Sequence, residues 1–468
     1  MLTLRLSYLF LAFALFAVAL VAPSTFFPFV GVKAYWFRLW VSAAAAFLWW
    51  YGFRASRESD SAHAEIRERF RRVTASPFVW AVTAFVGAFL ISTFLARDPS
   101  LAFWSNFERG EGGFAMLYLY AFFLLLLFVV RDGSTSLTAG ERSWRGLLWV
   151  SLVAAVLVVG YGILAMFDDP GNGKYFMGPT GISGVLRDRF AGSLGNPIYV
   201  GSYLLFVFFF IGSLYENIKY QIANSKYKIS NLKYKKWLLV ALAAFFSIFF
   251  VLSQGRGAMA GLAAGLLAGL GFASWAAHGR KRVVALCILA ALLLMGGALR
   301  YFKNSAPVRA VPIISRIARI SLTSDRTRLF AWGTAWEAFQ ERPLFGWGPE
   351  NFTEAFDRHF DIRHFTPGAP SSTWYDRAHS IIFDYLAELG AIGLAAFLSV
   401  FAVFYRQFFK FWDRKRVLRG ALWFAFPVAY LTQGIAIFDI FPIYIQLFFF
   451  LAYAAHEFSS EQNVVSSK

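Results

Sequence analysis

The sequence predicts an all-α polytopic membrane protein with about 12 transmembrane helices and one large extracytoplasmic helical loop. Composition supports this prediction: of the 468 residues, 58% are hydrophobic and 15% are charged, against about 45–50% and about 25% in soluble domains. Apolar stretches of about 20 residues, long enough to cross about 30 Å of hydrocarbon, recur along the chain. Lys and Arg gather in alternate connecting segments, as the positive-inside rule requires.

The predicted spans follow one another along the chain. They cover residues 7–29, 35–53, 77–96, 113–130, 146–166, 194–214, 237–253, 257–277, 283–300, 380–405, 420–437 and 441–455. With the amino terminus in the cytoplasm, the inside segments hold 26 Lys and Arg residues and the short outside loops hold seven. This excess predicts a multi-pass protein of the inner (plasma) membrane with both termini cytoplasmic. The net charge of +18 is thereby explained by topology in a lipid bilayer, and nucleic acid is not expected as a partner.

Topology divides the chain into three predicted parts. Residues 1–300 carry spans one to nine, residues 301–378 form the large extracytoplasmic loop with a helical cap, and residues 379–468 carry spans ten to twelve with a short cytoplasmic tail. Long loops are exempt from the charge rule, so the basic residues of 301–378 do not affect the predicted orientation.

Within that loop, aromatic residues recur at helical spacing. Trp332, Trp336 and Phe339 predict a helix over residues 325–341, which Pro343 ends. The turn that follows contains two glycines, Gly346 and Gly348, which adopt positive φ without steric cost.

A second, shorter helix is expected after that turn. It should cover residues 350–360 and start directly behind Pro349, since proline is favoured at the first position of a helix. Together the two helices would form the cap on the outer membrane surface.

Charged side chains at the membrane surface are costly and are therefore functional candidates. Arg256 lies in a very short outside turn between spans seven and eight, and Arg189 precedes a glycine-rich, irregular start of span six. Arg326 and Arg328 open the first outside helix. Guanidinium groups bind phosphate oxygens bidentately and keep their charge, so these arginines suit a lipid pyrophosphate. The alternatives are a snorkelling arginine at position 256 and a solvated helix face at 326 and 328.

His379 stands at the outer mouth of span ten, where a histidine can act as a base near neutral pH. Asp376, three residues earlier, is expected to share its helical face and to orient the ring. Deeper in the same span, Asp384 and Glu388 lie four residues apart and could pair with arginines or act in catalysis. The alternative for His379 is an interfacial histidine without a catalytic role.

The familiar motifs of nucleotide hydrolysis, zinc proteolysis and serine hydrolysis do not occur in the sequence. Carboxylates in the outside loop are scattered among arginines, so neither a metal nor a cofactor is predicted. ATP is not available outside the cytoplasm, so a transfer reaction there would need a donor that is already activated, and a lipid-linked donor is expected.

Several segments together resemble the signature of a known family. They are Ser324–Arg328, Arg342–Phe352, Ala378–Ser380 and Leu386–Leu394, with Asn106–Gly110, Arg189–Pro197 and Ser253–Arg256 upstream. The pattern is similar to that of the O-antigen ligase and O-antigen polymerase superfamily. This resemblance implies a class C glycosyltransferase-like membrane fold that uses an undecaprenyl-pyrophosphate-linked glycan as donor, without a metal.

The resemblance also implies roles for particular residues. His379 corresponds to the base of the family, and Arg256, Arg326 or Arg328, and Arg189 correspond to arginines that bind the pyrophosphate. The family usually has a His-Asn pair, whereas this chain has His379-Ser380.

The sequence does not identify the acceptor hydroxyl. A lipid A core sugar would make the protein a ligase, another repeat unit a polymerase, and a Ser or Tyr side chain a protein O-oligosaccharyltransferase. A secondary transporter is a more distant alternative, and it would require two related halves with interrupted helices near the midplane. A binding or scaffolding role without catalysis is the remaining one.

Overall fold

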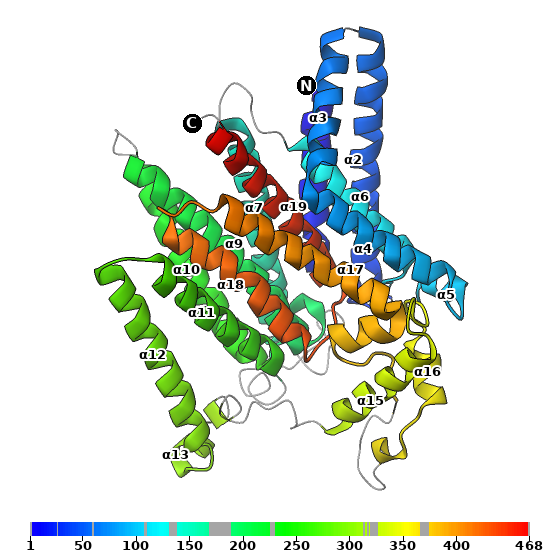
Figure 1. Ribbon diagram of the computed structural model, residues 1–468, viewed down its shortest axis with the longest axis vertical. Coiled ribbons are helices and arrows are strands. Elements are labelled where there is room, and N and C mark those ends of the chain that lie inside the picture. Colours follow the sequence, from blue (N-terminus) through cyan, green and yellow to red (C-terminus); the bar gives the residue numbers. More distant parts are fainter. Residues whose placement is uncertain are drawn as a thin grey trace. The chain divides into compact units, whose positions relative to one another are not determined.

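The computed structural model describes residues 2–25, 27–58, 60–106, 110–130, 138–167, 189–224, 230–311, 314–315, 318, 326–365 and 374–466. Over these residues the protein is helical and contains no strand (Figure 1). The helices are α1 (Leu2–Ala14), η1 (Leu15–Ala19), α2 (Gly31–Glu58), α3 (Asp60–Ala75), α4 (Pro77–Phe94), α5 (Pro99–Trp104), α6 (Gly113–Val129), α7 (Thr138–Ala165), η2 (Gly192–Leu194), α9 (Pro197–Asn224), α10 (Ser230–Ser253), α11 (Arg256–Ala276), α12 (Arg280–Tyr301), α13 (Ala306–Ala310), α15 (Arg326–Glu341), α16 (Phe352–Arg358), η3 (Ile362–His364), α17 (Ile381–Phe411), α18 (Val417–Gly434) and α19 (Phe441–Ser466).

Eight helices in the described part of the chain are long and apolar enough to cross a membrane. They are α4, α7, α9, α10, α11, α12, α17 and α19. Of two shorter apolar helices, Gly113–Val129 coincides with predicted span four, whereas Thr3–Ala19 overlaps predicted span one only up to residue 19, because the described residues from 20 to 30 are not helical. Helices α2 and α18 overlap spans two and eleven. The polytopic all-α membrane fold is therefore confirmed, whereas the number of 12 spans and the class C architecture stay predictions.

The chain forms two compact units by its contacts. Unit 1 consists of residues 1–154, 325–411 and 437–468, and unit 2 consists of residues 155–324 and 412–436. The three parts predicted from the sequence, which end at residues 300, 378 and 468, were defined by membrane topology and not by contacts. They stay a prediction.

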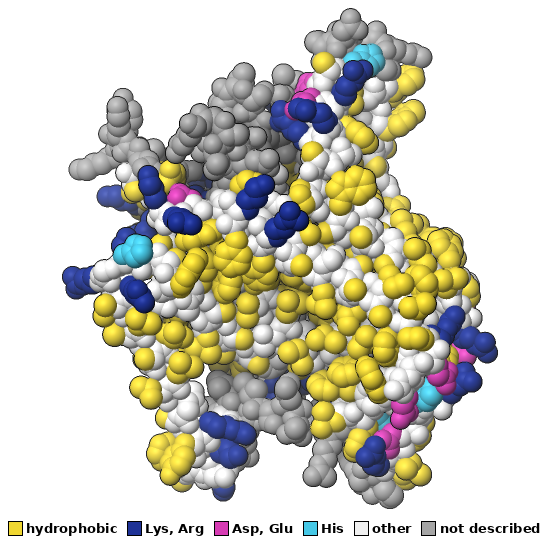
Figure 2. All heavy atoms as spheres, viewed as in Figure 1, with side chains coloured by type: hydrophobic (Ala, Val, Ile, Leu, Met, Phe, Trp, Pro, Cys, Tyr) yellow, Lys and Arg dark blue, Asp and Glu magenta, His cyan; other side chains and the backbone are white. Residues whose placement is uncertain are grey.

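In unit 1, α4 packs against α17, α6 against α19, and α1 against α2 (Figure 1). The span Phe441–Ser459 of α19 is 94% buried, so this helix is covered by protein on nearly all sides. Hydrophobic side chains cover the visible middle of α4 and α17, and Lys and Arg gather at α3 and at α15 and α16 (Figure 2). This distribution fits a hydrocarbon layer between α3 and the cap, which in the structure is residues 326–365.

In unit 2, α11 packs closely against α18 through a stripe of small residues. Every fourth residue of α11 on this face is glycine, at positions 257, 261, 265 and 269. A Cβ atom at Gly261 would lie 2.5 Å from the carbonyl oxygen of Ala429, and one at Gly265 would lie 2.8 Å from the Ala429 Cβ atom. Small residues let two backbones approach in this way, which is how transmembrane helices gain packing contacts in lipid.

We expect Gly261→Ala to lower the free energy of unfolding by about 1–3 kcal/mol, because the added methyl group overpacks the α11–α18 contact. The measurement is the thermal unfolding midpoint of the purified protein in detergent. Gly271→Ala is the matched control, since a Cβ atom at Gly271 meets nothing within 4 Å in the same helix. Alanine favours helices over glycine by up to about 1 kcal/mol, so the control should be neutral or stabilising. Equal shifts in both variants would contradict the packing argument.

Candidate active site

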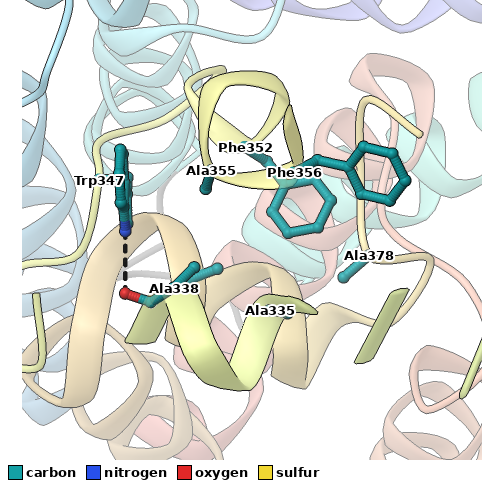
Figure 3. Close-up of a cluster of buried hydrophobic side chains, with 8 residues drawn as sticks. Ala335, Ala338, Trp347, Phe352, Ala355, Phe356 and Ala378 are labelled. Carbon is teal, nitrogen blue, oxygen red and sulfur yellow. Dashed lines mark hydrogen bonds between the residues drawn. The ribbon is translucent and has the colours of Figure 1, made fainter. Parts of the chain in front are cut away.

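The cap has its own small hydrophobic core, in which α15 and α16 pack together around alanines and aromatic rings (Figure 3). Trp347 is almost fully buried, and its Nε1 atom donates to the carbonyl oxygen of Ala338 at 2.8 Å. The predicted helix over residues 325–341 is confirmed by α15, although Ser324 and Asp325 lie outside the described residues. The core positions the turn after α15 against α17.

That turn is joined to a break in α17. The amides of Trp347 and Gly348 donate to the carbonyl oxygens of Ala387 and Glu388, each at 2.8 Å. Beyond the break, the amide of Ala391 donates to the carbonyl oxygen of Pro343 at 2.8 Å. The backbone groups that the interrupted helix leaves unpaired are thus satisfied by the cap.

Two glycines make this close approach possible. Gly346 and Gly390 have φ values of +66° and +67°. A Cβ atom at Gly346 would lie 2.4 Å from the carbonyl carbon of Glu388, and one at Gly390 would lie 2.4 Å from that of Leu344. The positive φ predicted for the turn glycines is confirmed, and the break in span ten is a feature that the sequence reasoning missed. Two glycines inside an apolar helical stretch, Gly390 and Gly393, were the available signal.

The predicted start of the second cap helix is wrong. α16 begins at Phe352, and Glu350 adopts a positive φ of +63° instead of a helical conformation. The reason lies in the contacts of Glu350. Its amide donates to the Glu388 Oε1 atom at 3.1 Å, and its carboxylate pairs with Arg377.

Arg377 is the centre of a buried ionic cluster. Its Nη1 atom donates to the Glu388 Oε2 atom at 2.8 Å, and its Nη2 atom donates to the carboxylates of Glu350 and Glu111, the latter at 3.3 Å. The exposed fractions of these side chains are 8% for Arg377, 4% for Glu111 and 2% for both Glu350 and Glu388. Burial by itself lowers the pKa of Arg377, but the carboxylates, Glu388 foremost, outweigh burial and hold that pKa above its ordinary value.

This cluster answers the question that the sequence left open for Glu388, which forms an ion pair with an arginine. The reasoning from sequence did not single out Arg377, Glu111 or Glu350. Glu111 is distant in the chain, so no local pattern connects it with the other two. For Arg377 the signal was its position two residues before His379.

His379 is half-buried and adopts a positive φ of +57°. Its Nδ1 atom lies 2.9 Å from the carbonyl oxygen of Arg377. Its ring packs edge-on against Tyr375 and Phe438, with ring centroids 5.1 Å apart in both pairs. Because a carbonyl oxygen only accepts hydrogen bonds, Nδ1 carries the proton of the neutral ring, and Nε2 keeps its lone pair.

The expectation that Asp376 and His379 share a helical face is wrong. Residues 374–380 are not helical, and α17 begins only at Ile381. This segment is held instead by hydrogen bonds such as the one from the Ala378 amide to the Asp384 Oδ1 atom, at 2.6 Å. A supporting role for Asp376 stays a prediction.

The first turn of α15 lies close to His379. The Thr327 Oγ1 atom and the Tyr375 hydroxyl are 2.8 Å apart, and the Tyr375 ring packs on the His379 ring. Arg326 and Arg328 flank Thr327 at this helix start. Arg328 is half-buried, and the side chain of Arg326 lies outside the described part of the chain. An N-terminal turn of a 16-residue helix adds positive potential to that of the arginines.

Arg189 and Arg256 belong to unit 2, where their two segments come together. The amide of Phe190 donates to the carbonyl oxygen of Leu252 at 3.0 Å, and the rings of Phe190 and Phe249 are 4.7 Å apart. Arg189 has a positive φ of +72°, and the exposed Arg256 is the first residue of α11.

The irregular start predicted for span six is confirmed by η2 and by the positive φ of Gly192 and Gly195. The Asn196 Oδ1 atom accepts from the amide of Ile198 at 2.9 Å, at the start of α9. In the upstream motif Asn106–Gly110, residues 107–109 lie outside the described residues.

Residues 240–398, about a third of the chain, match the family model described as O-antigen ligase. This match supports the resemblance of the chain to the O-antigen ligase superfamily. No curated protein sequence matches it. The segment that matches the O-antigen ligase family runs from α10 into α17 and contains the cap, Arg256, Arg377, His379 and Glu388. Arg189 and Glu111 lie upstream of it.

Proposed function

We propose that this protein transfers a glycan from an undecaprenyl-pyrophosphate-linked donor to an acceptor hydroxyl on the extracytoplasmic face of the membrane. The geometry of His379 is the observation that carries the proposal. Its Nδ1 atom faces the Arg377 carbonyl oxygen, which makes Nε2 the basic nitrogen of the ring, and the ring packs on Tyr375, whose hydroxyl contacts Thr327 in the first turn of α15. A base with one fixed tautomer next to a cationic helix start suits attack by a hydroxyl on a phosphate-activated sugar.

In the proposed reaction the acceptor oxygen attacks the anomeric carbon of the donor glycan. The bond between that carbon and the pyrophosphate oxygen breaks, and the His379 Nε2 atom takes the proton of the acceptor hydroxyl. The electron pair of the broken bond leaves with the undecaprenyl pyrophosphate. Metal-independence and the absence of a cofactor remain parts of this proposal.

The leaving pyrophosphate gains negative charge, so preorganised cations favour the reaction. Arg328 and Arg326 are proposed for this role, because they stand at the helix start that contacts Tyr375. Arg256 and Arg189 are proposed as further pyrophosphate ligands, supported by the family resemblance and by the N-terminus of α11, where Arg256 lies. Glu388 is proposed to support the reaction indirectly, because its ion pair with Arg377 holds the residue whose carbonyl oxygen faces the His379 ring.

The acceptor separates a ligase from a polymerase and from a protein O-oligosaccharyltransferase. Mass analysis of the glycans that accumulate in a deletion strain distinguishes these activities. Unligated polymer on the lipid carrier indicates a ligase or a protein transferase, and single repeat units indicate a polymerase.

We expect the purified protein in proteoliposomes to transfer glycan from the lipid-linked donor without an ion gradient. Arg328→Gln should lower the rate by about 10²-fold, the usual effect of removing one preorganised donor from a developing charge. Arg358→Gln is the matched control in the cap, since Arg358 is exposed and pairs with Glu341 at 3.5 Å. Transfer that requires an ion gradient would favour a transporter. An Arg328 variant as active as the Arg358 control would remove Arg328 from the site.

A further inference from the structure

A second site of unit 1 lies at the opposite ends of the helices that carry His379. It is a cavity of about 410 Å³ between α3 and the ends of α4, α6, α17 and α19. α17 begins two residues after His379 and reaches the cavity at Gln407. α19 begins with Phe441, whose amide donates to Glu111 of the Arg377 cluster, and reaches the cavity at His456. Because α17 and α19 are membrane spans by length and composition, the cavity lies at the other membrane face from His379.

One wall of this cavity is cationic. Arg69, Arg71 and Arg72 of α3 line it together with a single carboxylate, Glu68. Glu68 pairs with the Arg71 Nε atom at 2.9 Å and with the Arg72 Nε atom at 2.8 Å. These two hydrogen bonds, with Arg71 first, lower the pKa of Glu68 to about 2. Two guanidinium groups therefore share one carboxylate, and each keeps further N–H groups for an anion.

Arg69 has a different role in the same wall. It is buried, forms an ion pair with Glu65 at 2.9 Å, and donates to the carbonyl oxygen of Phe128 at 2.7 Å. The hydrogen bond to Phe128 fixes α3 against the end of α6, and the ion pair with Glu65 lies within α3. They hold Arg71 and Arg72, whose exposed fractions are 76% and 47%, at the edge of the cavity.

The rest of the lining is mixed. Val73, Pro77 and Leu127 give it apolar surface that is at least partly exposed, and Gln407, His456 and Ser459 add polar groups, next to Ser76 at the N-terminus of α4. Ser76 and Pro77 place the N-terminus of the 18-residue helix α4, which carries positive potential, at the cavity, and the Ser76 side chain makes no capping hydrogen bond there. A ligand that fits the arginines and the apolar part of the lining has an anionic group and an apolar body.

Exposed aromatic side chains indicate that the cavity opens at the level of the lipid headgroups. Phe70 of α3 is 63% exposed and Trp80 of α4 is 64% exposed. The Trp80 Nε1 atom donates to the carbonyl oxygen of Thr74 at 2.8 Å, which keeps the indole beside the end of α3. Amphipathic aromatic rings of this kind are enriched at membrane–water interfaces.

We infer that this cavity binds the phosphate headgroup of an anionic phospholipid. Arg71 and Arg72 hold the phosphate, and the acyl chains begin against Val73, Pro77 and Leu127. A soluble phosphate compound shares the headgroup chemistry, but it would leave this apolar part of the lining without a partner. The positive-inside rule assigns the same face to the cytoplasm, where the inner leaflet supplies such lipids. The inference does not depend on the glycosyltransferase proposal.

The test measures lipids retained by the purified full-length protein in detergent by native mass spectrometry. Phosphatidylglycerol is titrated against phosphatidylcholine, and glycerol 1-phosphate is added as a soluble competitor. We expect phosphatidylglycerol to bind at least tenfold more tightly, and Arg71→Gln with Arg72→Gln to weaken it about thirtyfold. Arg71→Lys with Arg72→Lys keeps both charges and should stay within about threefold of the wild type.

The matched control is Arg406→Gln with Lys410→Gln, which removes the same charge from the end of α17 outside the cavity. Both double glutamine variants should keep the thermal unfolding midpoint of the wild type. Equal losses in the two variants would reduce the effect to general charge attraction and overturn the site. Equal binding of phosphatidylcholine, or displacement by glycerol 1-phosphate, would overturn the phospholipid as its ligand.

Discussion

Replacing His379 with asparagine is expected to lower the rate of glycan transfer by about 10²–10⁴-fold, the usual contribution of a general base. Asparagine removes the Nε2 lone pair but tolerates the left-handed backbone conformation, which His379 adopts with a φ of +57°. Alanine would add backbone strain to the loss of the base. The measurement is the initial rate of transfer in proteoliposomes with the lipid-linked donor at a fixed concentration.

His359→Asn is the control for this experiment. His359 is another histidine of the cap, at the C-terminal end of α16, and its Nε2 atom lies 3.1 Å from a Glu341 carboxylate oxygen. We expect this variant to keep the wild-type rate. An active His379→Asn variant, with normal amounts of protein in the membrane, would show that another group takes the acceptor proton.

Replacing Arg377 with methionine is expected to lower the free energy of unfolding by about 3–5 kcal/mol, because three buried carboxylates would lose their common cation. Glu111, Glu350 and Glu388 each contact this guanidinium, and all three are at most 4% exposed. The thermal unfolding midpoint in detergent measures the effect. Glycan transfer should fall as well, since the ionic cluster holds the backbone of residue 377 in place, and the carbonyl oxygen of that residue orients the His379 ring.

Arg363→Met is the matched control, because the Arg363 side chain is 68% exposed, although it pairs with Asp361 and lies over the Phe330 ring at 4.5 Å from the ring centroid. Surface pairs of this kind contribute between zero and about 1 kcal/mol. A triple variant tests the physical cause: Arg377→Met combined with Glu350→Gln and Glu388→Gln should recover part of the lost stability. An Arg377→Met protein as stable as the Arg363 control would contradict the account of the cluster.

Local signals in the sequence predicted the helices well. Apolar stretches predicted the positions of α4, α6, α9, α10, α11, α12 and α19, because a helix that crosses the hydrocarbon layer needs about 20 mostly apolar residues, whether it faces lipid or other helices. The helical spacing of Trp332 and Trp336 predicted α15, and Pro343 predicted its end. Turn glycines at positions 346 and 348 were also predicted with their positive φ.

The features that the sequence did not predict depend on long-range contacts. Glu111 reaches Arg377 from 266 positions away, and only the folded chain brings them together. The break at Gly390 likewise becomes stable only because the turn after α15 supplies the missing hydrogen bonds. The helical face assumed for Asp376 and His379 was wrong because residues 374–380 are not helical, and α17 begins at Ile381, as the apolar pattern predicts to within one residue.

The crossing of the backbones at Gly346 and Gly390 also constrains the biogenesis of the protein. The chain is synthesised from its amino terminus, so the cap emerges before α17 exists. Until α17 is in place, the amides of Trp347 and Gly348 lack the acceptors that they use in the finished protein. Cap closure is therefore a late event that follows membrane insertion of α17, and the cap is not an autonomous module that could be transplanted without its broken helix.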